Sequence, residues 1–188
     1  MSNIIYWKKV ELLDFENHAK DFYDYYHLNP GKFMQINSFW TSFNPDYYEE
    51  YFSSHQTFDD ELKKFGKVKE INLLFILGNR SNLHSDHTTG LNSGVNVRLN
   101  IPILNCNGSL TCFYEFPEEY VNECIVSETG TKTWNSELIK KIDPVTSFQL
   151  SQPTLLRTSS PHIVLCLKNK VPRISMTISF YEDPVLDN

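Results

Sequence analysis

The chain has 188 residues, of which 40% are hydrophobic and 14% aromatic, so it can build a packed interior and is too apolar to be disordered. The formal net charge is −6 and the basic residues are scattered, which argues against a nucleic-acid partner. The longest apolar run, residues 71–78, is far shorter than the roughly 20 residues of a membrane span. We therefore expect one folded domain over residues 1–188, with no membrane partner.

Neither the N-terminus nor the cysteines suggest export or a redox site. Residues 1–20 carry acidic side chains after a short apolar patch and lack a small-residue cleavage site, which predicts a cytoplasmic protein. No cysteines form a C-x-x-C pair. If residues 107–108 form a two-residue hairpin turn, Cys106 and Cys112 are not directly opposite each other. The predicted free thiols are Cys106, Cys112, Cys124 and Cys166.

Residues up to about 66 mix helical and extended patterns. The segment "VELLDFENHAKDFYDYY" (10–26) has helix-like apolar spacing, and "GKFMQINSFW" (31–40) could be a strand. The segment "NPDYYEEYFSSHQTFDDELKKFG" (44–66) opens with an asparagine and a proline, which is typical of a helix start. We expect this part, about 1–66, to be a largely helical support that packs against something larger.

From about residue 67 the sequence changes to strands separated by turns. The predicted strands are "KEINLLFIL" (69–77), "GVNVRLNIPIL" (94–104), "GSLTCFYEF" (108–116), "PTLLRTSSPHIVLCL" (153–167) and "PRISMTISF" (172–180). No repeat, low-complexity tract or Ser/Gly linker interrupts them, so we place no domain boundary. The second part of the chain is predicted to be β-structure.

Two of these strands alternate apolar and polar residues with the period of two that gives a strand two different faces. The polar positions are Asn96, Arg98 and Asn100 in the first strand, and Arg173, Ser175, Thr177 and Ser179 in the second. Such a face can be the solvated outside of an ordinary sheet, or it can line a wet interior. The pattern alone leaves both interpretations open.

The segment "LHSDHTTG" (83–90) places two histidines and an aspartate within four residues. His84 and Asp86 are separated by one residue, so on an extended strand both side chains project to the same side and can hold one ion. His162 in "SSPHIVL" is the natural third ligand because it enters a strand directly after Pro161. Two imidazoles and one carboxylate are typical of non-haem Fe(II) oxygenases, where they leave the opposite face of the ion open.

Arg173 and Ser175 follow His162 at a distance of about a strand and a turn. Arginine suits a carboxylate because its planar fork donates two parallel hydrogen bonds and stays charged. A hydroxyl two residues further on can donate a third. An H-x-D pair alone also occurs in turns, so the hypothesis of a site depends on the order and spacing of all these residues.

These motifs resemble those of the Fe(II)- and 2-oxoglutarate-dependent dioxygenases. "HSD", "PH" and "RIS" match the HxD…H…RxS pattern of that superfamily between Leu73 and Phe180. The segment "VRLNIPILNCNGSLTCFYEF" (97–116) is similar to the aspartyl/asparaginyl β-hydroxylase type and to related phage-borne oxygenases. The resemblance implies a mainly β fold with N-terminal helices, namely a double-stranded β-helix or cupin-like jelly-roll barrel whose core spans about 67–182.

The resemblance also implies roles for individual residues. His84, Asp86 and His162 would bind iron, and Arg173 with Ser175 would bind the distal carboxylate of 2-oxoglutarate. The implied cofactor, cosubstrate and oxidant are Fe(II), 2-oxoglutarate and O₂. The implied reaction is hydroxylation of an amino-acid or peptide side chain, with release of succinate and CO₂.

Arg98 and Asn100 fall where the β-hydroxylase type has basic or imidazole side chains near the cosubstrate, and here an asparagine replaces a histidine. The resemblance therefore implies that both residues contribute to cosubstrate binding.

Three alternatives remain. His87 could replace His84 as a ligand or contact the substrate, although its direction alternates away from the H-x-D pair. "HSDH" matches the last four positions of the metallo-β-lactamase motif H-x-H-x-D-H, but Asn82 stands where the first histidine belongs. A non-catalytic cupin-like barrel that binds a metal or small ligand is the alternative function. A non-catalytic barrel would not explain why Arg173 and Ser175 occur together with the H-x-D pair and the distal histidine.

Overall fold

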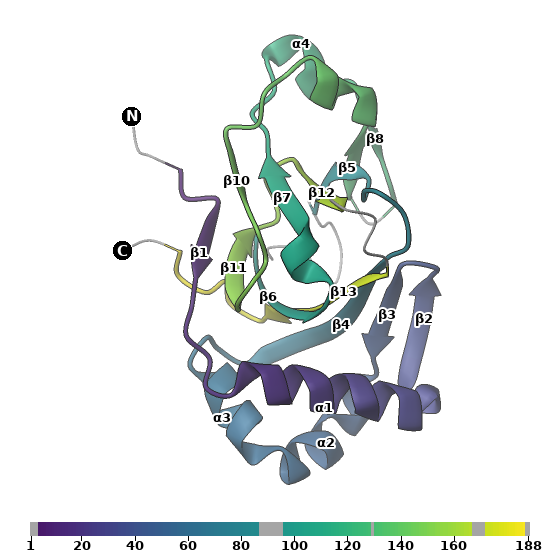
Figure 1. Cartoon of the computed structure of the whole chain (residues 1–188), viewed down its shortest axis with the longest axis vertical. Helices are drawn as coiled ribbons and strands as arrows, with labels where there is room; N and C mark the ends of the chain where they lie inside the picture. Colours follow the sequence, from purple (N-terminus) through teal and green to yellow (C-terminus); the bar gives the residue numbers. More distant parts are fainter. Residues whose placement is uncertain (1–3, 87–95, 129, 167–171, 187–188) are drawn as a thin grey trace.

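The computed structural model describes residues 4–86, 96–128, 130–166 and 172–186 and contains two antiparallel β-sheets (Figure 1). The major sheet has the strand order β1 (Trp7–Lys9), β11 (Thr154–Arg157), β6 (Val97–Leu104), β13 (Arg173–Phe180), β4 (Val68–Ile76), β3 (Trp40–Phe43) and β2 (Phe33–Asn37). The minor sheet has the order β10 (Thr146–Phe148), β7 (Ser109–Phe113), β12 (His162–Cys166), β5 (Leu83–Ser85), β9 (Lys132–Trp134) and β8 (Cys124–Val126).

Consecutive core strands alternate between the two sheets. β4 and β6 lie in the major sheet while β5 and β7 lie in the minor sheet, and the alternation resumes from β10 to β13. This is the winding of a double-stranded β-helix, or jelly roll. The predicted fold class, mainly β with N-terminal helices, is confirmed.

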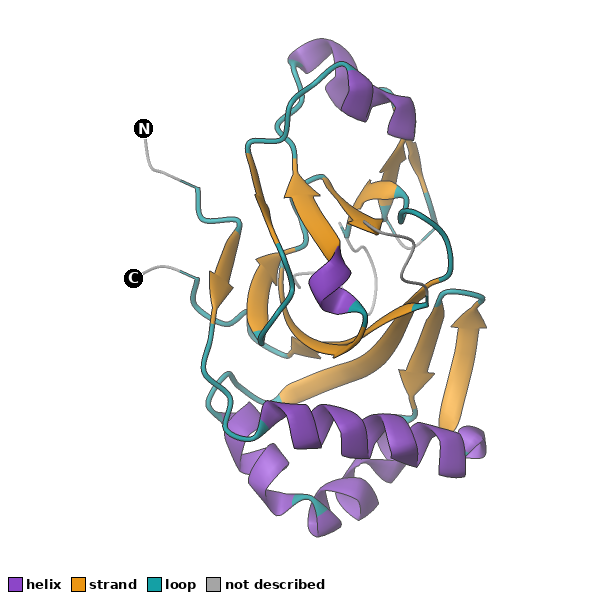
Figure 2. Cartoon of the chain, viewed as in Figure 1, coloured by secondary structure: helices purple, strands orange, loops and turns teal. Residues whose placement is uncertain are grey.

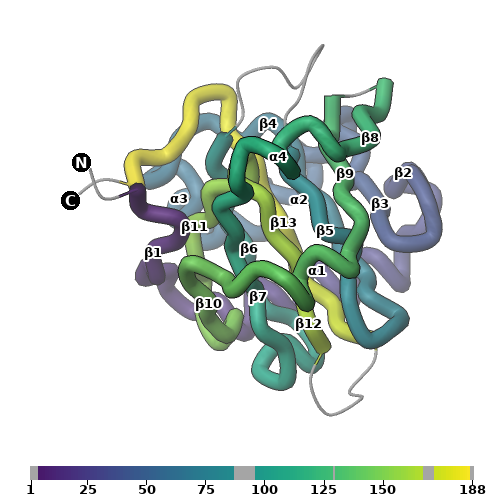
Figure 3. The backbone as a smooth tube through the Cα atoms, turned by 90° about the horizontal axis from the view of Figure 1, so that it is seen from above, coloured from purple at the N-terminus to yellow at the C-terminus, as the bar shows by residue number. Residues whose placement is uncertain are grey.

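Three helices cover one face of the major sheet (Figures 1 and 2). They are α1 (Phe15–Leu28), α2 (Tyr48–Ser54) and α3 (Gln56–Lys63), whereas the short α4 (Glu118–Val121) lies at the opposite end of the molecule. Ala19 and Phe22 of α1 are buried three residues apart, and Phe58 and Leu62 of α3 four apart, so each helix turns one apolar stripe to the sheet. The major sheet lies between these helices and the minor sheet (Figure 1), and in the view from above the helices lie behind the strands (Figure 3).

The two faces of the major sheet differ in polarity. Apolar side chains on one face pack in the same core as the helices, and they include Leu99, Ile101, Met176 and Ile178. The polar side chains of the opposite face are buried as well, and they are Arg98, Asn100, Arg173, Ser175, Thr177 and Ser179. A solvated outer face is therefore excluded for these strands. Their polar residues point into the barrel, toward the minor sheet.

Up to about residue 66, the helices and strands are of the predicted types, but they begin and end at other residues than predicted. The helix expected from residue 10 begins at Phe15, and the strand expected over 31–40 is a hairpin of β2 and β3. The helix start at 44–45 is confirmed, since Pro45 opens a 3₁₀ turn (Pro45–Tyr47) directly before α2. The Asn44 side chain accepts a hydrogen bond from the Asp46 N–H at 3.0 Å and so caps this turn.

The hairpin considered for residues 107–108 is wrong. β6 and β7 lie in different sheets, and a 3₁₀ turn (Cys106–Gly108) after left-handed Asn105 (φ 56°) carries the chain across. The segment 153–167 likewise divides into β11 and β12, in opposite sheets, because a jelly roll crosses between its sheets at such turns. The four cysteines, all within the described residues, are free as predicted. No helix in the described ranges is long and apolar enough to cross a membrane.

The aromatic contacts between helices and sheet predict which side chains contribute most to the free energy of unfolding. Phe22 is fully buried, and its ring lies 5.3 to 5.7 Å from those of Phe33, Phe43 and Tyr51. Phe22→Ala should lower the free energy of unfolding by about 3–5 kcal/mol, because it leaves a cavity in this cluster. Leu28→Ala in the same helix, where the side chain is 80% exposed, should change it by less than about 0.5 kcal/mol. Urea denaturation measures both, and equal effects would contradict the prediction.

Candidate functional site

Three side chains that the sequence singled out lie close together inside the barrel. β5 and β12 are antiparallel neighbours, and His84 is paired with His162 across them. The two imidazole rings are 4.4 Å apart between centroids, and His84 Nε2 lies 3.6 Å from Asp86 Oδ1. The prediction that the H-x-D pair projects to one side is confirmed.

Backbone contacts fix which ring nitrogen of each histidine is free. His84 Nδ1 lies 2.8 Å from the Asn82 carbonyl oxygen, and His162 Nδ1 lies 2.9 Å from that of Ser160. A carbonyl oxygen can only accept, so each Nδ1 carries a proton, and in the neutral ring Nε2 is then the nitrogen that has the lone pair. Metal-binding histidines commonly donate their second N–H in this way. Both rings are thus in the tautomer that could bind a cation through Nε2.

The protonation states of His162 and Asp86 also suit cation binding. Burial lowers the pKa of His162 to about 4, with a smaller contribution from His84, so the ring is neutral at pH 7. Burial would raise the pKa of Asp86, but the guanidinium of Arg98, together with His84 and His162, outweighs it and holds the pKa below its usual value. The site therefore offers neutral imidazole and an ionised carboxylate.

The donor atoms suit a divalent cation such as Fe(II), but they are not yet gathered around one point. No three His, Cys, Asp or Glu side chains in the described part of the chain form a ready-made metal-binding group. His87, the alternative ligand, lies outside the described residues. Metal binding by His84, Asp86 and His162 therefore remains a proposal, in which a cation draws neighbouring side chains together.

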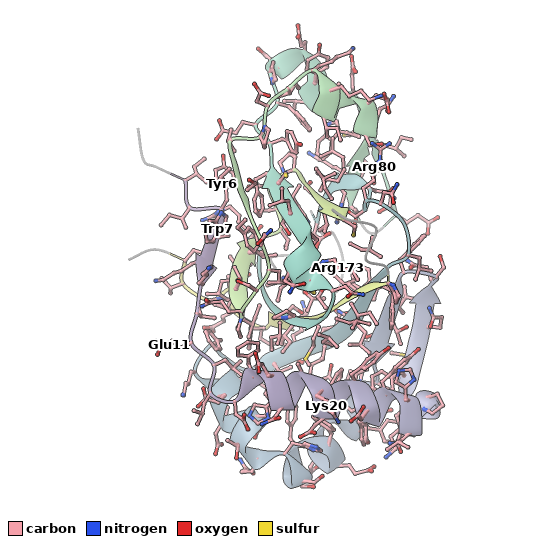
Figure 4. All side chains as sticks on the ribbon, in the orientation of Figure 1. Tyr6, Trp7, Glu11, Lys20, Arg80 and Arg173 are labelled. Atoms are coloured by element: carbon pink, nitrogen blue, oxygen red, sulfur yellow. The ribbon has the colours of Figure 1, made fainter. Side chains whose placement is uncertain are left out.

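Arg173 begins β13 and is buried, with 3% of its surface exposed. Its Nε donates to Ser109 Oγ at 3.0 Å and its Nη1 to Ser175 Oγ at 3.1 Å. No carboxylate of the described residues forms an ion pair with it. Figure 4 shows Arg173 among the strands, above the helix that carries Lys20. A buried cation held only by hydroxyls is costly without a counter-charge, so this position can receive an anion.

Arg98 lies in β6 beside the H-x-D pair. Its Nε is 3.4 Å from Asp86 Oδ2, its Nη1 is 3.6 Å from Glu70 Oε2, and its guanidinium carbon is 5.6 Å from the ring centroid of Trp40.

Asn100 belongs instead to a row of buried polar residues that crosses the inner face of the major sheet. In strand order the row is Thr154, Asn100, Thr177, Asn72 and Ser42.

Sequence reasoning missed several residues of this interior. Glu70 and Asn72 stand two apart in the apolar run "KEINLLFIL", so period-two alternation could have placed them on the same face as Arg98. Trp40 and Ser109 carry no comparable signal, because their contacts with Arg98 and Arg173 join strands that are distant in the sequence. Two surface grooves, one along α2 and α3 and one near β1 and the segment after β13, contain none of the three candidate ligands.

Solved structures of similar shape come from proteins that were crystallised with 2-oxoglutarate. The epimerase SnoN, in complex with Fe³⁺, α-ketoglutarate and nogalamycin RO, aligns with a TM-score of 0.55 and 7% identity over 92% of this chain and 77% of its own. HygX from Streptomyces hygroscopicus, with nickel and 2-oxoglutarate, aligns with a TM-score of 0.54 and 10% identity over 96% of this chain and 83% of its own. A HygX structure that also contains hygromycin B has a TM-score of 0.55 and 8% identity, with the same coverage.

No protein-family model matches the chain, and a comparison with curated proteins gives no match either. At sequence identities this low, the structural likeness establishes the fold alone. The double-stranded β-helix is therefore shared with SnoN and HygX, and the roles of the residues must be argued from this chain.

The lowered pKa of His162 predicts a pH dependence of folding. Below about pH 6.5 the unfolded chain protonates this histidine while the folded chain does not, so the free energy of unfolding should fall as the pH drops from about 6.5 to about 4. His162→Gln should flatten this part of the profile, whereas His27→Gln, at an exposed position, should leave it unchanged. Urea denaturation at a series of pH values measures the slope, and an unchanged profile for His162→Gln would refute the prediction.

Proposed function

We propose that this protein is an Fe(II)- and 2-oxoglutarate-dependent oxygenase. One observation carries the proposal: the same buried interior holds two imidazoles and a carboxylate at one place and, at another, an arginine without an anionic partner in the described residues. A metal and an anionic cosubstrate would satisfy these two groups together. The fold shared with SnoN and HygX, both crystallised with 2-oxoglutarate, supports this reading.

The spacing between the two groups suits a short dicarboxylate. On the minor sheet His162 pairs with Phe113 and Cys166 pairs with Ser109, the hydroxyl that accepts from Arg173. Four residues of strand separate these positions, which is about 13 Å of backbone. The arginine side chain, a five-carbon dicarboxylate and an imidazole can together span this distance.

Each residue has a defined part in the proposed reaction. His84 and His162 would hold the cation through Nε2, the nitrogen that does not face a backbone carbonyl, and Asp86 would hold it through its carboxylate. Arg173 and Ser175 orient the distal carboxylate of 2-oxoglutarate, and the buried barrel walls exclude water. Iron supplies the oxidising chemistry with 2-oxoglutarate and O₂ when it is bound.

For the substrate we propose a small molecule, and specifically the side chain of an amino acid or peptide, which is hydroxylated. The resemblance of residues 97–116 to the β-hydroxylase type supports this choice. HygX and SnoN were crystallised with hygromycin B and nogalamycin RO, which supports a small-molecule substrate in general. SnoN is an epimerase, so the fold is compatible with a different oxidative outcome.

The proposed function is tested by succinate release from 2-oxoglutarate after O₂ is admitted to anaerobically reconstituted protein. Release should require both Fe(II) and 2-oxoglutarate, and His84→Ala and Asp86→Ala should each abolish it while circular dichroism shows a folded chain. Metal binding without any succinate would favour the non-catalytic cupin-like barrel.

Arg173→Gln should weaken 2-oxoglutarate binding roughly tenfold or more, because it removes the charged fork that would hold the distal carboxylate. Binding of Co(II) should stay within about twofold, since the variant leaves the metal ligands in place. Arg157→Gln is the matched control, because Arg157, at the end of β11, is partly exposed and donates from Nε to the Ile5 carbonyl oxygen. Calorimetry with each ligand gives the affinities, and parallel loss of both would count against the assignment.

A further inference from the structure

We propose that Glu70 is a positioning residue for the metal centre. It shares the guanidinium of Arg98 with Asp86 and so leaves Asp86 Oδ1 available to a cation. The inference rests on the proposed function of the His84, Asp86 and His162 group, and it adds a residue that no motif includes.

The geometry places Arg98 between two carboxylates. Its Nε is 3.4 Å from Asp86 Oδ2 and its Nη1 is 3.6 Å from Glu70 Oε2, so the fork is divided between the two acids. Arg98 is 2% exposed, so bulk water screens its attraction to the two carboxylates only weakly. Asp86 Oδ1, the other carboxylate oxygen, is the one that lies 3.6 Å from His84 Nε2.

Neither contact is a full hydrogen bond. Arg98 Nε, Arg98 Nη1 and Glu70 Oε2 are buried atoms that have no hydrogen-bond partner in the described residues. A carboxylate and a guanidinium prefer a bidentate pair with two short parallel hydrogen bonds. Without Glu70, Asp86 would be the remaining carboxylate in contact with Arg98 in the described ranges, so the fork could close on both Asp86 oxygens and compete with a metal.

The charges of Glu70, Asp86 and Arg98 also favour cation binding by Asp86. Glu70 and Asp86 carry two negative charges against the single positive charge of Arg98, so the cluster keeps one net negative charge beside the imidazoles. Without the charge of Glu70, the positive charge of Arg98 would be left to Asp86 alone, and the attraction of Asp86 for a cation would weaken. The Trp40 ring, 5.6 Å from the guanidinium carbon, restrains Arg98 from the side.

A double-mutant cycle tests whether Glu70 acts through Arg98. Binding of Co(II) is measured anaerobically by calorimetry and by the visible absorption of the bound ion in the wild type, Glu70→Gln, Arg98→Gln and the double variant. Glu70→Gln should weaken Co(II) binding about tenfold or more, as expected for a residue that orients a ligand. In the Arg98→Gln background the same change should have an effect of less than about threefold.

Two further variants separate positioning from general charge and from misfolding. Glu118→Gln removes the same charge at an exposed position in α4 and should leave Co(II) affinity unchanged. Glu70→Asp keeps the charge but shortens its reach, so it should restore part of the affinity that Glu70→Gln loses. Circular dichroism establishes that each variant is folded.

The outcomes are distinct. An unchanged affinity in Glu70→Gln overturns the inference, and so does an equal loss with and without Arg98, which would mean that Glu70 acts by direct attraction alone. If the wild type itself does not bind Co(II), the proposed metal centre fails, and the result is recognisable because no variant is needed to observe it.

Discussion

The structure depends on a major sheet whose two faces are both buried but differ in polarity. Met176 and Ile178 pack among the helices, while Ser175, Thr177 and Ser179 of the same strand face the inside of the barrel. The largest buried apolar cluster thus lies outside the barrel, between helices and sheet, where rings such as that of Phe22 supply it. A smaller apolar cluster, which includes Phe113, Phe148 and Leu156, joins the two sheets inside the barrel, and the rest of the interior can hold polar chemistry.

A polar interior costs free energy of folding, because polar groups that leave water need hydrogen-bond partners. Several atoms on the inner face have no hydrogen-bond partner in the described residues, among them Trp40 Nε1, both amide atoms of Asn72 and Ser179 Oγ. Selection for stability alone would replace such groups by apolar ones of similar size. Their concentration on the face that also carries Arg98 and Arg173 is what a site for a polar ligand and its ordered water requires.

The parts of this arrangement that are local in the chain could be predicted from the sequence. Period-two alternation placed Arg98 with Asn100 and Arg173 with Ser175, and one-residue spacing placed His84 with Asp86. The parts that depend on which strands become neighbours could not be predicted. The turn at 106–108 resembles a hairpin but crosses between sheets, and β5, β8 and β9 have three residues each, too few to show a pattern. For the same reason the contact of Arg98 with Glu70 was missed, since it joins β6 to β4 across β13.

The crossing turns also explain how two sheets can present one site. His84 and His162 belong to the minor sheet, whereas Arg98 and Arg173 belong to the major sheet, so the site depends on the register between the sheets. The turn between β11 and β12 fixes that register at the end that holds His84, Asp86 and His162. There the Asp86 N–H donates to the Thr158 carbonyl oxygen at 2.7 Å, and the Thr158 N–H donates to that of Asn96 at 2.8 Å. One residue thus ties the end of β5 to the start of β6. The backbone that carries Asp86 is held by the same turn that delivers His162, so His162 and the H-x-D pair are positioned by a single local structure rather than by two independent strands.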